Sequence, residues 1–200
     1  LVMSALFKDT IKEIGKKIKI FLSILFMALL GVGFFAGIRA TTPDMQNTID
    51  SYFNDLNVSD INILSSTGFT LEEIDDLENI QGIKEIELVN TIDTLGDVKD
   101  KEYVFKTITY NDNINKIILS EGRLPERANE CVLDEEIEGI NLGDTITLKT
   151  NDPRFIEQQL KVVGFAKSPL YVSNDRGSST LASGTVDYFM YINQDNVRGN

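Results

Sequence analysis

The sequence predicts an α+β protein in which one membrane-spanning helix precedes a mixed α/β and strand-rich domain. The 19 residues from Ile20 to Ile38 carry no charged side chain. Residues 1–39 hold six basic and two acidic residues, a net charge of +4, whereas residues 40–200 hold 13 basic and 29 acidic residues, a net charge of −16. From Ile83 onward, apolar and polar residues alternate as in strands, with glycines and prolines between the runs.

Residues 1–19 predict a basic amphipathic helix at the cytoplasmic membrane interface. Five lysines lie mostly on one face of this helix. Such a helix buries its apolar face at the boundary between headgroups and acyl chains. The alternative is a plain extension of the helix that follows. Apolar residues recur at helical spacing on the other face: Leu6, Phe7, Ile11, Ile14 and Ile18.

Residues 20–39 predict a transmembrane helix. A helix of 19 residues is about 28 Å long, close to the roughly 30 Å hydrocarbon core of a bilayer. A secretory signal has a shorter apolar core and small residues before its cleavage site, and Ile38 and Arg39 before Ala40 fit that pattern poorly. Since the lysines precede the run, the N-terminus is expected in the cytoplasm and residues 40–200 outside.

Small residues within the span predict a face that packs against a second helix. Gly33 and Gly37 have the G-x-x-x-G spacing, and Ala36 and Ala40 repeat the same interval. Small side chains at this spacing let two helices approach closely in a membrane.

Beyond the membrane, the sequence predicts a stalk helix and then a strand–helix–strand unit. Thr42 as N-cap with Pro43 in the first turn predicts a helix that ends near Asn57. An apolar run at 60–65 predicts a short strand. Thr70 and Glu73 form a capping-box pattern that begins a helix ending near Asn79.

The remainder of the chain predicts a series of strands. Residues 84–92 and 101–110 predict two strands with a turn at Leu95–Asp97 between them. The Ser-, Gly- and Asn-rich segment from Ser168 to Gly184 predicts a long loop. The acidic run from Asp134 to Glu138 is expected to face water. Further strands are predicted near 116–119, 130–134, 144–150, 159–166 and 186–192.

Composition excludes several kinds of chemistry. The chain has no histidine, which excludes Ser-His-Asp and Cys-His catalysis within it. Its single cysteine, Cys131, lies in a predicted strand and is expected to be buried. An EF-hand beginning at Asn111 would need Gly at position 116 and Glu at position 122, where the chain has Lys116 and Gly122. The net charge of −16 on residues 40–200 argues against nucleic-acid binding. No catalytic, cofactor or metal site is predicted.

Several short motifs resemble those of the FtsX/MacB-like family of ABC transporter permeases. The order of the segments matches: a basic interfacial helix, one span and a large extracytoplasmic domain. Gly122, Arg123 and Pro125 resemble the family's GR-x-P turn. The later matching pieces are 129–134, Leu142-Gly143-Asp144 and Val162-Val163-Gly164. From the residues themselves, Gly122 and Pro125 bracket a predicted turn, 142–144 is a turn before a strand, and Gly164 follows an apolar strand. All of these roles are architectural, and no substrate contact is predicted.

The resemblance implies that residues 40–200 are a MacB-like core domain, and the chain is expected to be a fragment of a longer permease. It implies a separate cytoplasmic ABC ATPase that binds the ATP, with no cofactor in this chain. It also implies a homo- or heterodimer of permease subunits in the cell membrane of a Gram-positive bacterium. ATP-driven movement of the domain would serve export, extraction or signalling, and the sequence does not identify the substrate.

Two other hypotheses remain open from the residues alone. The first is a membrane-anchored extracytoplasmic binding or sensor domain with a single span. The second is a secreted domain released by signal cleavage near Thr41.

Overall fold

The computed structural model describes residues 2–99, 101–173 and 175–198. The chain divides into two compact units, residues 1–52 and 53–200. Of the apolar face predicted for the first helix, Phe7 and Ile18 are described and exposed. The side chains of Leu6, Ile11 and Ile14 lie outside the described residues.

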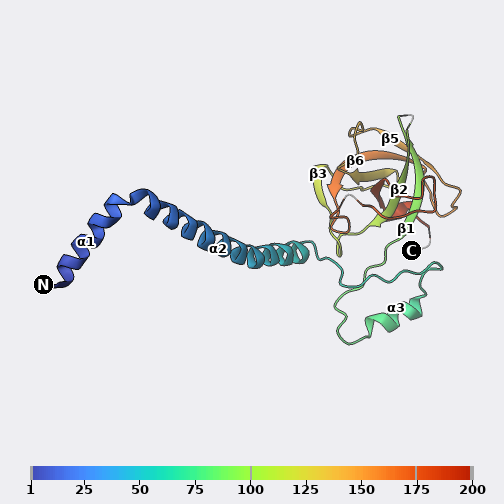
Figure 1. Cartoon of the computed structure of the whole chain (residues 1–200). Coiled ribbons are helices and arrows are strands. Elements are labelled where there is room, and N and C mark those ends of the chain that lie inside the picture. Colours follow the sequence, from blue (N-terminus) through green and yellow to red (C-terminus); the bar gives the residue numbers. More distant parts are fainter. Residues whose placement is uncertain (1, 100, 174, 199–200) are drawn as a thin grey trace. The chain divides into compact units, whose positions relative to one another are not determined.

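The N-terminal unit is helical. Helix α1 (Val2–Lys16) ends one residue before α2 (Ile18–Asp55) begins, and the two appear as separate coils in Figure 1. Lys17 forms the break, with its N–H bonded to the carbonyl of Glu13 at 3.1 Å. Helix α2 therefore begins two residues before the predicted start of the apolar segment at Ile20.

Helix α2 is long and apolar enough to cross a membrane by length and composition. None of its 38 residues is buried against other parts of the chain that the structure describes. Since large apolar side chains such as Met27, Leu30 and Phe34 are at least 73 % exposed, this helix needs a lipid or protein environment to cover them.

The helix start predicted at Thr42 is wrong, because α2 continues through Pro43 to Asp55. A proline inside a helix lacks an N–H and leaves the carbonyl of the residue four positions earlier, here Arg39, without its helical donor. Thr41 does not act as a cap either, since its hydroxyl donates back to the carbonyl of Gly37 at 2.9 Å. The span and the predicted stalk are therefore one helix.

Residues 56–90 contain a single helix, α3 (Leu71–Glu78), and its predicted capping box is confirmed. The N–H of Glu73 donates to the hydroxyl of Thr70, and the N–H of Thr70 donates to the Glu73 carboxylate. The strand predicted at 60–65 is wrong, and so is strand structure at 84–90. Among the described residues, 60–65 pairs with no strand, and 84–90 reaches β2 only at Asn90, whose carbonyl accepts a bond from the N–H of Thr109 at 2.9 Å. An extended segment becomes a strand only when it pairs along its length.

Residues 91–193 form one seven-stranded mixed sheet in the order β3-β6-β4-β7-β2-β1-β5 (Figure 1). Because β5 also pairs with β6, six of the strands close into a ring, and β3 is attached to β6 outside it. The pairs β2–β7 and β4–β6 are parallel and the others antiparallel. A 3₁₀ turn, η1, spans Gln194–Asn196. The strands are β1 (Thr91–Val98), β2 (Lys101–Tyr110), β3 (Ile118–Gly122), β4 (Glu130–Asp134), β5 (Thr145–Lys149), β6 (Gln159–Lys167) and β7 (Tyr188–Asn193).

The predicted turn at Leu95–Asp97 is wrong, because these residues lie within β1. Gly96 pairs with Tyr103 on β2. A Cβ atom at Gly96 would lie 3.0 Å from the Phe105 ring, so the glycine lets this ring approach the backbone. The β1–β2 connection begins at Lys99, whose φ is 47°.

Alternating side chains of the strands form two apolar clusters. The six ring strands fill the interior with buried residues that include Phe105, Leu133 and Met190, and Cys131 lies there as predicted. A second cluster around Phe189 and Tyr191 lies on the opposite face of β2, β4, β6 and β7. The long predicted loop follows β6 and contributes Tyr171 to this second cluster. The predicted α+β fold is confirmed.

Candidate functional site

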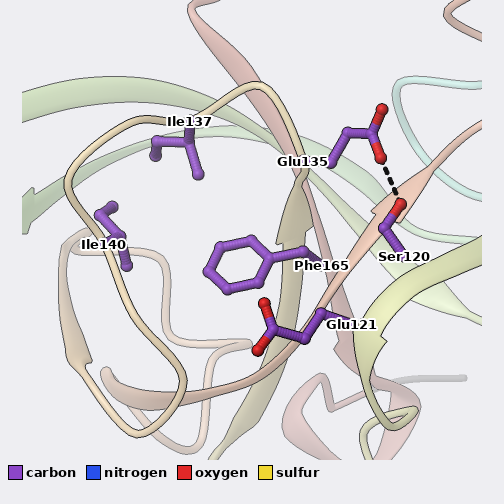
Figure 2. Close-up of a pocket in the computed structure, with 6 residues that line it drawn as sticks. All are labelled: Ser120, Glu121, Glu135, Ile137, Ile140 and Phe165. Atoms are coloured by element: carbon purple, nitrogen blue, oxygen red, sulfur yellow. Dashed lines mark hydrogen bonds between the residues drawn. The ribbon is translucent and has the colours of Figure 1, made fainter.

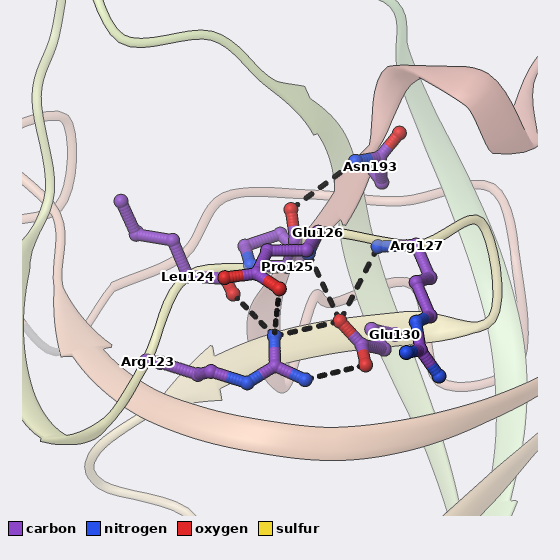
Figure 3. Close-up of polar contacts among 7 residues, drawn as sticks. All are labelled: Arg123, Leu124, Pro125, Glu126, Arg127, Glu130 and Asn193. Carbon is purple, nitrogen blue, oxygen red and sulfur yellow. Dashed lines mark hydrogen bonds and ion pairs between the residues drawn. The ribbon is translucent and has the colours of Figure 1, made fainter.

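The GR-x-P turn after β3 is held by an ion pair (Figure 3). Two nitrogens of the Arg123 guanidinium lie 2.5 and 2.7 Å from the two carboxylate oxygens of Glu130, the first residue of β4. The backbone N–H groups of Glu126 and Arg127 donate to the same carboxylate. The carbonyl of Pro125 accepts a hydrogen bond from the Asn193 amide at 3.2 Å. These bonds fix the turn against the ends of β4 and β7.

Neighbouring hydrogen-bond donors keep the Glu130 carboxyl charged although this residue is only 4 % exposed. The bidentate bond from Arg123 lowers the pKa of the Glu130 carboxyl to about 2, and the two backbone donors act in the same direction against burial. The carboxylate is therefore a permanent acceptor at neutral pH and has no free proton to exchange in acid–base chemistry.

Two glycines let the GR-x-P turn lie directly on β6. Gly122 has a φ of 81°, and a Cβ atom there would lie 2.2 Å from the carbonyl oxygen of Val163. A Cβ atom on Gly164 would lie 2.6 Å from the carbonyl oxygen of Arg123. The motif pieces at 122–125 and 162–164 are thus in backbone contact, which explains why the second needs a glycine.

The third motif piece, at 142–144, immediately precedes β5 and is tied to the β1–β2 hairpin. The Asp144 carboxylate accepts a bond from the N–H of Asn141 at 2.8 Å and pairs with the Lys99 ammonium at 2.6 Å. The hydrogen bond from Lys99 lowers the pKa of the Asp144 carboxyl. The N–H of Gly143 donates to the carbonyl of Val162 at 2.8 Å. The motif pieces therefore converge on β6.

Sequence reasoning missed a buried ion pair beneath the long loop. Asp134, which was expected to face water, is 1 % exposed, and its carboxylate lies 2.6 Å from Nε of Arg176. The guanidinium also lies over the rings of Tyr171 and Phe189, at 5.8 and 5.6 Å from their centroids. No sequence signal marked Arg176, because its partner is 42 residues away.

A hollow of about 310 Å³ lies between β3, β6 and the loop that follows β4 (Figure 2). Phe165, Ile137 and Ile140 form its apolar part. Ser120 and two carboxylates, Glu121 and Glu135, form its polar part. The volume is at the lower end of the range for ligand sites and suits one side chain or a similar group.

The four small residues predicted to pack in the membrane are all exposed on α2. Nothing among the described residues lies within 4 Å of a Cβ atom built on Gly33 or Gly37. The space for a second helix is present on this face, and the packing itself stays a prediction for Gly33, Ala36, Gly37 and Ala40.

Over the residues that the structure describes, no group of three or more Cys, Asp or Glu side chains is arranged to hold a metal ion. Burial raises the pKa of the Cys131 thiol far above its ordinary value, which leaves it a poor nucleophile. The arrangement is suited to binding and to mechanical support. Its charged side chains fix turns and loops, and its exposed features include the apolar helix α2 and the hollow beside β3.

Comparison with known proteins identifies the family. The family model for the MacB-like periplasmic core domain matches residues 20–199. The extracellular domain of the noncanonic ABC-type transporter YknZ from Gram-positive bacteria matches at 14 % identity and a TM-score of 0.42, over 66 % of this chain and 65 % of that one. The periplasmic region of MacB from Actinobacillus actinomycetemcomitans matches at 16 % identity and a TM-score of 0.35, over 62 % and 55 % of the two chains. A search of curated proteins finds no match.

The chain therefore spans less than two thirds of either solved domain that it matches. The family model itself covers the apolar part of α2, the GR-x-P turn and the whole sheet. On that match, this chain belongs to the family of MacB-like periplasmic core domains of FtsX/MacB-type transporter permeases.

Proposed function

We propose that this chain is part of the membrane subunit of an FtsX/MacB-type ABC transporter, in which a separate cytoplasmic ATPase moves the extracytoplasmic domain. The observation that carries the proposal is the extent of the family match, which runs from the apolar helix into the sheet domain without a break. The domain acts together with the helix that anchors it.

The continuity of α2 supports a mechanical role. The apolar segment belongs to a single helix of 38 residues that continues through Pro43 to Asp55 without a loop, and residues 56–90 follow it before the first strand. A helix of this length spans about 57 Å, roughly twice the hydrocarbon thickness of a bilayer. A movement of its cytoplasmic end is thus transmitted as a rigid-body motion to the segment outside the membrane. The transported or sensed molecule is export cargo, an extracted lipid or peptide, or a signal.

Partners follow from the same proposal. The bilayer surrounds residues 20–39, the ATPase lies on the side of the basic N-terminal helix, and a second permease subunit packs on Gly33 and Gly37. The N-terminus is cytoplasmic and residues 40–200 are extracytoplasmic in the cell membrane of a Gram-positive bacterium. ATP binds the partner subunit.

Co-purification from membranes tests the proposal. This chain is expressed with the cytoplasmic ABC ATPases of the same organism, one at a time and each with its own tag, and for one of them either tag should retain both proteins in detergent. An ATPase variant unable to hydrolyse ATP should still bind, while the wild-type ATPase should show turnover that depends on the permease. A result in which none of these ATPases binds or changes its turnover would contradict the proposal and favour the single-span binding or sensor domain.

A further inference from the structure

We propose that the free edge of β3 and the hollow beside it bind an extended peptide segment that places an arginine side chain against Glu121. This inference does not depend on coupling to an ATPase. It rests on an unpaired strand edge, an apolar hollow and the charge of its rim.

The strand edge is the first observation. Each of the six ring strands pairs on both sides, whereas β3 pairs only with β6 among the residues that the structure describes. Four of its five residues are exposed. An unpaired edge presents backbone N–H and C=O groups that a second extended chain can bind.

The hollow is the second observation, since two of its lining residues, Ser120 and Glu121, belong to β3. In Figure 2 the Glu121 carboxylate lies below the ring of Phe165, while Ile137 and Ile140 lie on its other side. A side chain on an added strand lies about 5 Å from its cross-strand neighbour on the same face. A long side chain opposite Glu121 therefore reaches both the carboxylate and the ring.

The carboxylate of Glu121 favours an arginine side chain in the hollow. Glu135 already pairs with Lys167 at 3.1 Å and accepts a hydrogen bond from Ser120, whereas Glu121 has no side-chain partner within the described part of the chain. A planar guanidinium binds a carboxylate through two hydrogen bonds and stacks on an aromatic ring, and its three methylenes suit the isoleucine wall. The net charge of −16 on residues 40–200 also attracts a basic peptide.

The same features disfavour indiscriminate pairing. The register of β3 against β6 shifts between Leu119 and Glu121, which bends the edge, and Glu121 places a charge on it. A bulge and a charge protect an edge from apolar strands. A strand that carries a positive charge pairs with Glu121, so the same charge that disfavours apolar strands favours a basic one.

Peptide binding to the 200-residue chain in detergent micelles tests the proposal. The probe is the peptide acetyl-Thr-Val-Arg-Val-Thr-amide, and its control carries citrulline, the neutral isostere of arginine, at the central position. Titration measures affinity, and hydrogen exchange of residues 118–122 reports pairing along β3. The variants are Glu121→Gln and, as a matched control, Glu157→Gln, an exposed acid that does not line the hollow.

We expect the arginine peptide to slow exchange at residues 118–122 and to bind about fivefold more tightly than the citrulline peptide. Glu121→Gln should remove that difference, and Glu157→Gln should preserve it. The proposal is overturned by an absence of binding, by protection elsewhere than β3, or by an arginine preference that persists in Glu121→Gln.

Discussion

At the scale of single residues, the buried carboxylate of Glu130 holds the GR-x-P turn in place. The Arg123 side chain is 46 % exposed, but its partner Glu130 is only 6 % exposed. A buried carboxylate is costly unless donors surround it, and here two guanidinium nitrogens and two backbone N–H groups do so. The glycines at 122 and 164 act in the same place, since both remove a side chain that would collide with backbone.

The lowered pKa of Glu130 predicts acid sensitivity. The carboxyl has a pKa of about 2 in the folded chain and an ordinary value of 4.5. A depressed pKa contributes stability that is present above the ordinary value and is lost as the pH falls toward the folded value. Glu130→Gln should therefore lower the free energy of unfolding by roughly 2 to 3 kcal/mol at pH 7.

That difference should shrink as the pH falls from about 4.5 to about 2. Chemical unfolding of wild type and variant at several pH values measures it. Glu157→Gln serves as the control, because its exposed side chain has no partner among the described residues and should leave the unfolding free energy within about 0.5 kcal/mol of wild type. If Glu130→Gln lowers the free energy of unfolding equally at pH 2 and pH 7, the lowered pKa of Glu130 is contradicted.

At the scale of elements, the loop after β6 is tied down by one side chain. Arg176 is 5 % exposed and links Asp134 at the end of β4 to the stacked rings of Tyr171 and Phe189, whose centroids lie 5.3 Å apart. The hydroxyls of Ser168 and Tyr191 add a buried hydrogen bond at the start of the loop. The loop thereby covers the apolar cluster on the outer face of the ring.

Removing one partner of this ion pair should cost more than removing both. Arg176→Met leaves the Asp134 carboxylate buried and unpaired, which should destabilise the fold by about 3 to 5 kcal/mol. The double variant Arg176→Met with Asp134→Asn should recover part of that loss. Unfolding free energies and hydrogen exchange across residues 168–187 measure both effects. Additive losses in the double variant would show that the two side chains act independently.

At the scale of the whole molecule, one apolar helix and one acidic sheet domain imply a protein anchored in a membrane. The two compact units divide at residue 52, and the uncharged run at 20–38 belongs to the first. The five lysines before Ile20 predict that the N-terminus is cytoplasmic.

Cysteine labelling checks this orientation. Cys131 is fully buried and its thiol pKa is raised, so the unsubstituted chain should give little background with a membrane-impermeant maleimide. Lys12 and Thr67 are both exposed. Thr67→Cys should be labelled on intact cells, and Lys12→Cys only after the membrane is opened. The reverse pattern would place the N-terminus outside, and labelling of both on intact cells would contradict a span between them.

Residues close together in the sequence determined much of this protein by themselves. The apolar run at 20–38, the capping box at Thr70 and Glu73, and strands β2, β4, β5, β6 and β7 were predicted correctly, because periodicity and capping are local properties. The pieces around Gly122 and Gly143 lie at turns, as their residues predicted, whereas Gly164, expected after an apolar strand, lies within β6. Their resemblance to a known family pointed to the family that the comparison then identified.

Only the tertiary structure decided which residues meet. Extended segments at 60–65 and 84–89 have the right composition for strands but form no strand ladder within the described part of the chain. Gly96 serves a close ring contact instead of a turn. The pair Arg123–Glu130 depends on how the turn after β3 lies against the start of β4, and the pair Asp134–Arg176 depends on the path of a long loop. A sequence pattern records the chemistry of each residue, but pairing across 42 residues is fixed by the packing of the whole sheet, which no local pattern contains.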